Sequence, residues 1–490
     1  MDRPSVSVAV VGGGVTGLAT AHFLEQAAKE EGWELKGTLV EKDERIGGKL
    51  LTSVEDGFVV EGGPDSFLTQ KPWALEMAKE LGMEPDLLSQ ASHGVFLLYQ
   101  GKLHSVPRGL MGVVPTRAGD LWKASFLSWR GKLRASMEPF IRRRRNGGDE
   151  SLAAFLRRRL GREVSERLVE TFTASLYAGD AQQLGLRELF PALAQWEEQY
   201  GSLTRGLRAV QARPRPSSTS ASPFISLRNG MASLPKAMAN SLTDFKFVLG
   251  SRVTAIIHHR EHDHPPFHLS LQGGDYIDAD CVVLAIPASD SSVLLRPISP
   301  QTALLLGRLT FAPTASVTLA FRRDAVTHPL NGSGFLVPRV EPSLITACTW
   351  SSSKWSGRVP QGWVLLRAFL GWSGDNSFLN QDDLTVVRLA TDVLRPILGL
   401  RGAAERSWVH RWPQAMPQYK IGHLTWLKEL QQTLTDLPGV FLAGASYQGV
   451  GIPDCIRQGK EASQRVRQLL SQRIVHLREG TQTIKGSALP

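Results

Sequence analysis

The chain has 490 residues, of which 42% are hydrophobic and 21% charged, so it has a globular composition and the length of two or three domains. Its formal charge of +10 favours an anionic partner, such as a nucleic acid, a membrane surface or a carboxylate-bearing substrate. The three cysteines are widely spaced, which excludes a disulfide framework or a zinc knuckle and predicts a reducing cytoplasm as the location.

The N-terminal residues "MDRPSVSVAVV" enter an apolar run at once, so we expect no signal peptide. No apolar stretch approaches the length that spans a bilayer. These features predict a soluble protein that is cytoplasmic or, at most, peripheral at the inner face of a membrane.

The first predicted elements are a strand at Val8–Val11, a glycine-rich turn and a helix from about residue 18. The turn reads G-x-G-x-x-G, with glycines at Gly12, Gly14 and Gly17. In a dinucleotide-binding fold they allow the tight turn, the approach of a pyrophosphate and close packing of helix on strand. The helix start adds free N–H groups for the phosphates. A turn with only a structural role is the alternative.

A second strand is predicted at residues 37–41, and it ends in Glu41, 24 residues beyond Gly17. Lys42 follows directly. A carboxylate at this place can bind both ribose hydroxyls of an adenosine and would repel a 2′-phosphate. The pattern therefore predicts NAD or FAD as the bound dinucleotide.

The residues that follow distinguish these two cofactors. Arg45, Gly47, Gly48 and Lys49 form R-x-G-G-K, and "VEGGPDSFL" stands at 60–68. A domain that binds only a nicotinamide cofactor would continue into another helix, whereas this chain makes a second glycine turn and a short strand pair. The arrangement resembles the flavin-binding fold of the amine-oxidase superfamily and predicts FAD. A plain surface loop is the alternative.

Residues 92–210 read as helices that are apolar on one side and basic on the other. Between residues 123 and 162 there are twelve Lys or Arg against three Asp or Glu, a local charge of +9. This surface is either a solvated helical face or a contact with anionic lipid or with an acidic partner protein. Nucleic acid is disfavoured as the partner, because no recognised binding module surrounds the patch.

The segment 211–223 is rich in Pro and Ser and reads as a linker. A β-meander follows, and strands predicted between residues 300 and 425 suggest a broad mixed sheet. "HHREHDH" at 258–264 is rich in metal-ligating residues, but its place in a hairpin turn favours no metal site. The tail beyond residue 473 is expected to be unstructured.

Near the C-terminus, the apolar run "GVFLAG" leads into "GASYQGVGIPDCIRQGK" at 444–460. This predicts a strand, a second glycine-rich turn with Gly444, Gly449 and Gly451, and a helix whose first position is Pro453. A helix start aimed at the flavin ring would stabilise negative charge on reduced flavin. We therefore expect the glycine turn at residues 12–17 and the one at residues 444–451 to hold the two ends of one FAD. An ordinary strand–turn–helix is the alternative for the C-terminal segment.

Over roughly residues 1–472 the chain resembles the flavin-dependent protoporphyrinogen and coproporphyrinogen oxidases of haem biosynthesis, in their Gram-positive bacterial branch. The resemblance rests on "GGGVTGLA", "ERIGGK", "EGGPDSFL", "SLYAGD", "GSGFLVP", "TACTW", "RWPQAMPQYKIGH" and the 444–460 segment. It implies an α/β fold that combines an FAD-binding Rossmann-like domain, a mixed-sheet substrate domain and an inserted helical domain.

The resemblance also implies domain boundaries and site residues. The FAD-binding domain would comprise 1–70, 225–297 and 435–472; the substrate-binding domain 71–91, 211–224 and 298–434; the helical domain 92–210; and a flexible tail 473–490. FAD would be bound by Gly12, Gly13, Gly14, Val15, Thr16, Gly17, Glu41, Lys42, Lys49, Gly63, Pro64, Asp65, Ser66, Val253, Trp412, Gly444, Val450, Gly451 and Ile452.

For the substrate, the resemblance implies that Gly179 presents its backbone to the tetrapyrrole core and that Lys71 binds a propionate, both within the catalytic site. An exposed lysine on a turn is the alternative for Lys71. The candidate walls of an apolar slot, each of which could instead be a core residue, are Phe335, Leu336, Ile345 and Phe369.

The implied reaction is the FAD- and oxygen-dependent oxidation of coproporphyrinogen III to coproporphyrin III, with protoporphyrinogen IX as a second substrate. Hydride transfer to flavin N5 would occur in three two-electron steps and would form peroxide. Two alternatives remain open: an amine oxidase or carotene desaturase of the same superfamily, and a non-catalytic binding protein on the same fold.

Overall fold

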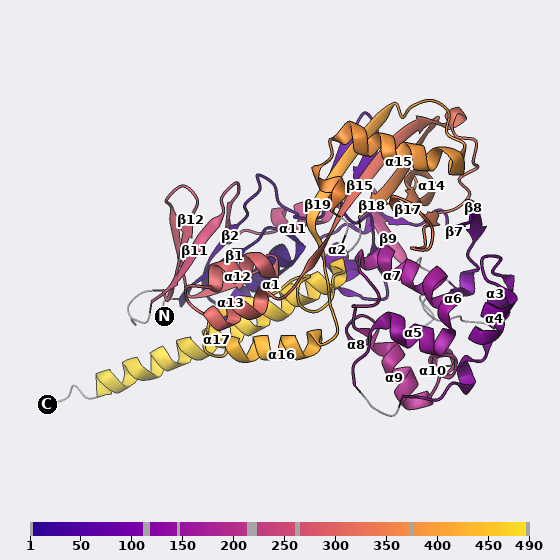
Figure 1. The fold of residues 1–490 in the computed structure, drawn as a ribbon. Coiled ribbons are helices and arrows are strands. Elements are labelled where there is room, and N and C mark those ends of the chain that lie inside the picture. Colours follow the sequence, from indigo (N-terminus) through magenta and orange to yellow (C-terminus); the bar gives the residue numbers. More distant parts are fainter. Residues whose placement is uncertain are drawn as a thin grey trace.

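The computed structural model describes residues 3–110, 118–144, 148–212, 223–259, 265–371, 374 and 376–486. The linker residues 213–222 and residues 260–264 of "HHREHDH" lie outside them. Figure 1 shows a parallel-sheet domain, a domain built on a seven-stranded sheet above it, and a helical domain to one side. The fold is the predicted α/β combination.

The parallel-sheet domain contains a five-stranded sheet in the order β10-β2-β1-β14-β20, with every pair parallel. Its β1 reads as one apolar run because alternate side chains enter two separate cores: Val8 packs under α1, and Ala9 packs against the β11–β13 sheet. The strands are β1 (Ser5–Val11), β2 (Glu34–Val40), β10 (Phe245–Val248), β11 (Val253–His258), β12 (Phe267–Leu271), β13 (Tyr276–Ala279), β14 (Cys281–Leu284) and β20 (Val440–Leu442).

The two longest helices of this domain pack against each other although they come from opposite ends of the chain. A side chain at Gly459 of α17 would meet Ala19 Cβ and Thr16 O of α1, both at 2.7 Å, so the helices cross at backbone distance. The helices of this domain are α1 (Val15–Glu31), α11 (Ser233–Asn240), α12 (Ala288–Leu295) and α17 (Ile452–Gly486). Two helices from the segment predicted for the substrate domain, α13 (Pro300–Leu306) and α16 (His423–Leu434), also pack against its core.

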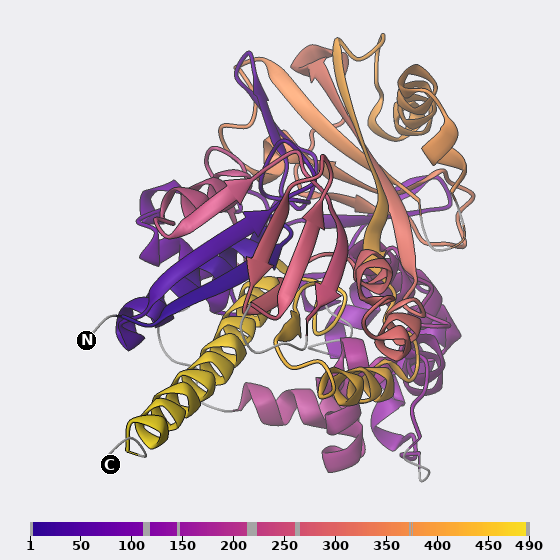
Figure 2. The same ribbon diagram turned by 90° about the vertical axis from the view of Figure 1, so that its left-hand side faces the viewer.

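Helix α17 extends from the body of the molecule toward the C-terminus (Figure 2). The expectation of an unstructured tail beyond residue 473 is thus corrected for 473–486, which continue the helix. Two small sheets and α2 (Trp73–Glu80) connect this domain to the rest of the chain. Their strands are β3 (Thr52–Glu55), β4 (Phe58–Glu61), β5 (Phe67–Leu68), β6 (Leu87–Ser89) and β9 (Phe224–Leu227).

The seven-stranded sheet has the order β19-β15-β18-β17-β16-β7-β8 and is mixed, because β16 pairs parallel with β7 while its other pairs are antiparallel. Helix α15 (Asp383–Leu398) covers one face (Figure 1). The strands are β7 (Val95–Tyr99), β8 (Lys102–Ser105), β15 (Phe311–Arg322), β16 (Gly334–Leu336), β17 (Ile345–Trp350), β18 (Trp363–Leu370) and β19 (Arg406–Pro417), and α14 spans Ser351–Lys354.

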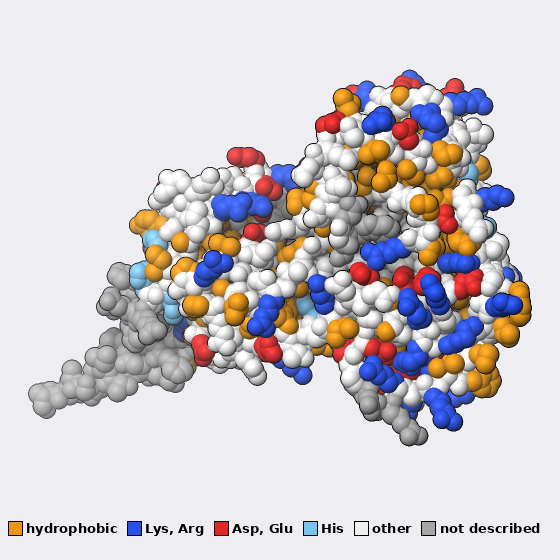
Figure 3. All heavy atoms as spheres, viewed as in Figure 1, with side chains coloured by type: hydrophobic (Ala, Val, Ile, Leu, Met, Phe, Trp, Pro, Cys, Tyr) orange, Lys and Arg blue, Asp and Glu red, His pale blue; other side chains and the backbone are white. Residues whose placement is uncertain are grey.

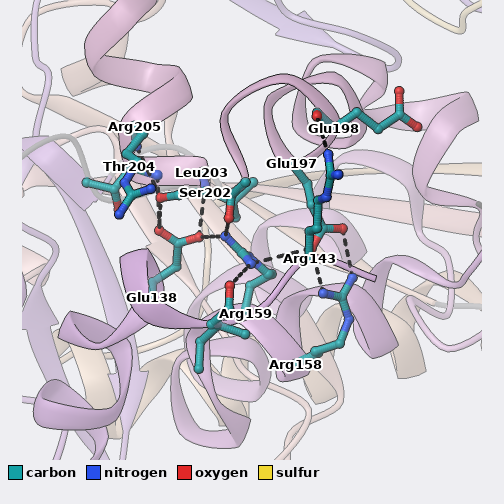
Figure 4. Close-up of polar contacts among 12 residues, drawn as sticks. Glu138, Arg143, Arg158, Arg159, Glu197, Glu198, Ser202, Leu203, Thr204 and Arg205 are labelled. Atoms are coloured by element: carbon teal, nitrogen blue, oxygen red, sulfur yellow. Dashed lines mark hydrogen bonds and ion pairs between the residues drawn. The ribbon is translucent and has the colours of Figure 1, made fainter. Parts of the chain in front are cut away.

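The helical domain is organised around buried charges (Figure 4). The Glu138 carboxylate accepts hydrogen bonds from Leu203 N (2.8 Å), Thr204 N (3.1 Å) and Ser202 Oγ (2.7 Å) at the start of α10, and Arg159 donates to it. The helices are α3 (Ala118–Lys123), α4 (Trp129–Ser136), α5 (Leu152–Leu160), α6 (Arg162–Val164), a π-helical turn (Ser165–Val169), α7 (Glu170–Tyr177), α8 (Leu186–Leu189), α9 (Pro191–Tyr200) and α10 (Leu203–Gln211).

Candidate functional site

The N-terminal turn, residues 12–17, joins β1 to α1 with the geometry of a phosphate-binding turn. Gly12 has a φ of +110°, and a side chain at Gly17 would lie 1.9 Å from Gly12 O. By contrast, a Cβ at Gly14 would meet nothing within 4 Å. The first and third glycines are therefore needed for the fold itself, whereas the second leaves open space at the start of α1.

Glu41 lies at the end of β2, beside this turn. Its Oε2 accepts a hydrogen bond from Gly13 N at 2.7 Å, and its Oε1 accepts one from Asp43 N at 3.0 Å. The carboxylate is buried and oriented by two backbone donors. Lys42, in contrast, is exposed. The structure therefore brings the predicted ribose-binding carboxylate next to the predicted phosphate-binding turn.

The second glycine turn lies directly against the first. Gly47 N donates to Gly13 O at 2.8 Å, and a side chain at Gly48 would lie 3.2 Å from Gly14 Cα. Lys49 follows in this turn, and its Nζ donates to Ala415 O at the end of β19. Burial lowers the pKa of Lys49 to about 8. A bound anion would act in the opposite direction, because a nearby negative charge favours the charged form of the lysine.

The Gly63–Ser66 segment is held from the seven-stranded sheet. Arg367 of β18 donates to Gly63 O at 2.7 Å. Asp65 accepts from Lys354 Nζ (2.8 Å) and Trp355 Nε1 (3.0 Å), and although burial alone would raise the Asp65 pKa, Lys354 and Trp355 bring it well below its usual value. Ser66 Oγ donates to Asp65 Oδ1 at 2.8 Å. These bonds fix the Pro64-containing segment between two domains.

The C-terminal turn, residues 444–451, reaches the same place from the other end of the chain. A side chain at Gly444 would lie 3.6 Å from Thr16 Oγ1, and a side chain at Gly449 would lie 2.6 Å from the Asp454 carboxyl carbon. Helix α17 begins at Ile452, one residue before the expected Pro453. The N-terminal turn and the C-terminal turn are therefore adjacent in space, as expected for two parts of one binding site.

Lys71 has a partner that the sequence did not predict. Its Nζ donates to both carboxylate oxygens of Asp454, at 2.7 and 2.6 Å, across 383 positions of sequence. The Lys71 side chain is 43% exposed, while that of Asp454 is 10% exposed. A propionate would approach Lys71 in competition with this carboxylate, and propionate binding by Lys71 stays a prediction.

Two further residues predicted for the cofactor site take different positions. Trp412 of β19 is partly buried, and its Nε1 donates to Gly62 O at 2.7 Å, next to the Gly63–Ser66 segment. Val253 is buried at the start of β11, in the core between this small sheet and the parallel sheet. Contact of either residue with a cofactor stays a prediction.

The four candidate slot walls are divided between the two faces of the seven-stranded sheet. Phe335 and Ile345 are 1% and 0% exposed in the core beneath α15, which corrects the expectation that they line the slot. Leu336 packs toward the helical domain, and Phe369 shares its face of β18 with Arg367, which contacts Gly63. Leu336 and Phe369 therefore stay candidates.

Gly179 is buried just beyond α7. A side chain there would meet Gln418 Oε1 and Leu184 Cδ1, both at 2.6 Å, so glycine is required by packing. The sequence missed two groups of polar residues. Arg358 and Arg367 bond to Glu61 and to Gly63 O, beside the Gly63–Ser66 segment. Gln418, Tyr419 and Asp454 bond to Tyr177 O, to the C-terminal turn and to Lys71. One signal was available, because Arg367 interrupts the apolar run "GWVLLRAFLG" of a strand. A buried arginine in such a strand needs a specific partner.

The model of the family described as flavin containing amine oxidoreductase matches residues 15–467. The chain belongs to this family. It is therefore a flavoprotein oxidoreductase whose cofactor is FAD, as predicted. The open space at Gly14, the oriented Glu41 carboxylate and the adjacent C-terminal turn fit such a cofactor.

The chain is similar over nearly its whole length to proteins of the predicted branch. It is 35% identical to the coproporphyrinogen III oxidase of Bacillus subtilis, over 93% of this chain and 96% of the relative. It is 31% identical to the coproporphyrinogen III oxidase of Staphylococcus aureus, over 94% of this chain and 98% of the relative. These similarities confirm the predicted resemblance to the Gram-positive branch.

A solved structure supports the fold of this flavoprotein. The crystal structure of a protein from Exiguobacterium sp. 255-15, provisionally assigned as a protoporphyrinogen oxidase, superposes with a TM-score of 0.83 at 31% identity. The match covers 95% of this chain and 99% of that one.

Within the described residues, no helix is both long and apolar enough to span a bilayer.

Proposed function

We propose that this flavoprotein oxidises coproporphyrinogen III to coproporphyrin III with molecular oxygen as the final electron acceptor. The observation that supports this most strongly is the 35% identity, over 93% of the chain, to a relative with that activity in its name. The net charge of +10 suits a substrate with several carboxylates. Protoporphyrinogen IX is the second substrate, since relatives at 30% identity over 94% of the chain are protoporphyrinogen oxidases.

Bound FAD would supply the electron acceptor that a porphyrinogen needs to become aromatic. The residues of this chain would contribute position and environment. Gly14, Glu41 and Lys49 would hold the dinucleotide end, and the C-terminal turn would hold the flavin end. Leu336 and Phe369 would offer apolar surface to the macrocycle.

The substrate end of the site combines backbone and charge. Gly179 would bring its backbone close to the macrocycle, and Lys71 would attract a propionate. In this arrangement the two hydrogen bonds to Asp454 orient Lys71 at the start of α17. We also propose the domain division given by residues 1–70, 225–297 and 435–472 for FAD, with the substrate between the seven-stranded sheet and the helical domain.

Porphyrin fluorescence tests the assignment, because porphyrinogens are not fluorescent and porphyrins are. Purified protein is mixed with coproporphyrinogen III or protoporphyrinogen IX in air, and the rate of fluorescence gain is measured for each. We expect a higher kcat/KM for the four-carboxylate substrate. A clear preference for protoporphyrinogen IX would overturn the substrate assignment, and turnover of an amine or a polyene alone would replace it with the amine oxidase or desaturase alternative.

One surface of the helical domain suggests where the protein could meet a membrane. Lys and Arg side chains gather on this domain, with apolar side chains among them at its outer edge (Figure 3). Five large apolar side chains are between 47% and 79% exposed on α3, on α4 and just beyond it: Trp122, Trp129, Leu133, Met137 and Phe140. We propose that this surface binds the anionic face of a membrane peripherally, since apolar side chains among basic ones suit that interface.

Vesicle binding tests the membrane contact. Replacement of Trp129, Leu133 and Phe140 by Ser should remove co-sedimentation with vesicles that contain anionic phosphatidylglycerol, and replacement of Arg142–Arg144 by Gln should weaken it. Leu384→Ser is the control, because Leu384 is 83% exposed on α15. Unchanged vesicle binding by both variants, or no binding by the parent protein, would leave the basic surface as a solvated face.

A further inference from the structure

The segment that follows β19 carries two consecutive side chains that reach different parts of the candidate site. Gln418 is 4% exposed and Tyr419 is 3% exposed. The backbone of this segment is fixed to the helical domain, since Gly185 N donates to Tyr419 O at 2.9 Å and Ile421 N donates to Gln183 O at 3.1 Å. The two side chains reach different loops, since Gln418 bonds to Tyr177 O and Tyr419 bonds to Ala445 O, so one short segment contacts two separate loops.

The Gln418 amide holds the turn at residues 177–179. Its Nε2 donates to Tyr177 O at 3.0 Å and to Met416 O at 3.0 Å. Ala178 has a φ of +47°, so α7 ends there in a left-handed conformation that few residues other than glycine adopt. A side chain at Gly179 would collide with Gln418 Oε1. The amide and the glycine therefore fit each other, and the turn is held in a form that it would not adopt alone.

The Tyr419 hydroxyl holds the C-terminal turn. It donates to Ala445 O at 2.6 Å and accepts from Gly449 N at 3.0 Å, so one group joins both arms of the turn. The Tyr419 ring stacks on His423 at 4.0 Å, which fixes its orientation. Burial raises the pKa of Tyr419 well above its usual value, so the hydroxyl retains the proton that it donates.

The two turns that these residues hold lie close to each other. Gln418 bonds to Tyr177 O, and the next residue, Tyr419, bonds to Ala445 O and Gly449 N, so both turns lie within reach of two consecutive side chains. We propose that Gln418 and Tyr419 are positioning residues that fix the 177–179 turn relative to the C-terminal turn, and thereby set the substrate slot against FAD. This inference rests on the proposed function for the slot.

Tyr419→Phe tests the flavin end, because it keeps the ring and removes both hydrogen bonds. We expect faster amide hydrogen exchange in residues 444–455, together with a shift in the reduction potential and in the visible spectrum of bound FAD. We also expect kcat to fall by about tenfold or more, with little change in KM. Tyr447→Phe is the matched control, since Tyr447 is buried in the same turn but its hydroxyl has no hydrogen-bond partner among the described residues. It should leave the reduction potential unchanged.

Gln418→Met tests the other end, because methionine has a similar size and cannot donate. We expect KM for the porphyrinogen to rise by about tenfold while the reduction potential of FAD stays at the parent value. The proposal is overturned if either variant folds and retains FAD but has the hydrogen exchange, reduction potential, kcat and KM of the parent protein. It is also overturned if Tyr447→Phe has the same effect as Tyr419→Phe. Failure of the parent protein to oxidise any porphyrinogen would refute the proposed function, while exchange and potential would still test Tyr419.

Discussion

Among single residues, Gly17 is needed for the backbone of the turn to fold, whereas Gly14 is needed to leave space for the cofactor. Gly17→Ala places a Cβ 1.9 Å from Gly12 O, so we expect a loss of about 3 kcal/mol or more of stability and little folded protein. Gly14→Ala meets no atom within 4 Å, so apo-protein stability should change by less than about 1 kcal/mol. FAD affinity should nonetheless fall by about 100-fold, because the added methyl occupies the path of the pyrophosphate. Thermal unfolding of apo-protein and an FAD titration measure the two effects; parent-like FAD affinity in Gly14→Ala would contradict this site.

Lys49 should make FAD binding depend on pH. Burial lowers its pKa to about 8 in the protein without cofactor, and a bound pyrophosphate would raise it again. Above pH 8, binding must therefore take up a proton, and FAD affinity should be about tenfold weaker at pH 9 than at pH 7. Flavin fluorescence titrations at both pH values measure this change. Lys49→Met should remove the dependence, and an equally steep dependence in that variant would assign it to another group.

The residues that could be predicted are those whose role is set by near neighbours in sequence. Gly12, Gly17 and Glu41 belong to a short strand–turn–helix–strand unit, and the structure places them as its pattern requires. The contact between Lys71 and Asp454 spans 383 positions, so no local pattern announces it. Phe335 and Leu336 are neighbours on one strand and must point to opposite faces, but the sequence does not say which face meets the site.

At the element scale, the crossing of α1 and α17 determines whether the two glycine turns meet. Gly459→Val inserts a side chain where even a Cβ would lie 2.7 Å from Ala19 Cβ and Thr16 O. We expect a loss of about 1–3 kcal/mol of stability and a weaker hold on FAD, because the start of α17 is displaced from the N-terminal turn. Gln464→Val, at an exposed position of the same helix, should change stability by less than about 0.5 kcal/mol. Full FAD occupancy in Gly459→Val at the parent Tm would contradict this role of the crossing.

Elements with strong patterns were predicted, and their ends were not. The strands expected between residues 300 and 425 appear in the seven-stranded sheet, since their apolar residues alternate or fill both faces. The end of α17 was missed because polar residues beyond 473 remove the apolar periodicity and Gly480 disfavours a helix, although residues 473–486 contain no proline. The start of α17 was expected at Pro453, one residue too late, because a helix start is fixed by hydrogen bonds, here Cys455 N to Gly451 O at 2.9 Å.

In the molecule as a whole, buried ion pairs stabilise the helical domain, which carries the proposed membrane-binding surface. Arg159 is 0% exposed and pairs with Glu138, which is 1% exposed (Figure 4). Arg159→Met would leave Glu138 buried without its cation and should cost about 3–5 kcal/mol in the free energy of unfolding. Arg162→Met is the control: its side chain is 79% exposed in an i,i+4 pair with Glu166, worth about 0.5 kcal/mol or less. Thermal unfolding of both holoenzymes measures the difference, and equal Tm values would contradict a structural role for the buried pair.

The same network should weaken in acid. Burial alone would raise the pKa of Glu138, but the donors at the start of α10 and the charge of Arg159 lower it below its ordinary value of 4.5. A carboxyl group whose pKa is lower in the folded state stabilises the fold above its unfolded-state pKa, and this contribution is lost as pH falls through the folded-state value. The stability difference between the parent and Glu138→Gln should therefore shrink below about pH 4.5. Urea unfolding at pH 7 and pH 4 measures it, and a difference that grows in acid would contradict this sign.

If both ends of the chain hold one FAD against a porphyrinogen slot, electrons from the substrate must pass to the flavin, and an anaerobic titration measures this transfer. Flavin-loaded protein is mixed with coproporphyrinogen III without oxygen, and flavin absorbance and porphyrin fluorescence are followed together. Aromatisation of one porphyrinogen removes six electrons, so three flavins should lose their oxidised absorbance for each coproporphyrin formed. Flavin that stays oxidised while the substrate is present, or porphyrin that forms with no loss of flavin absorbance, would contradict this arrangement of FAD and substrate.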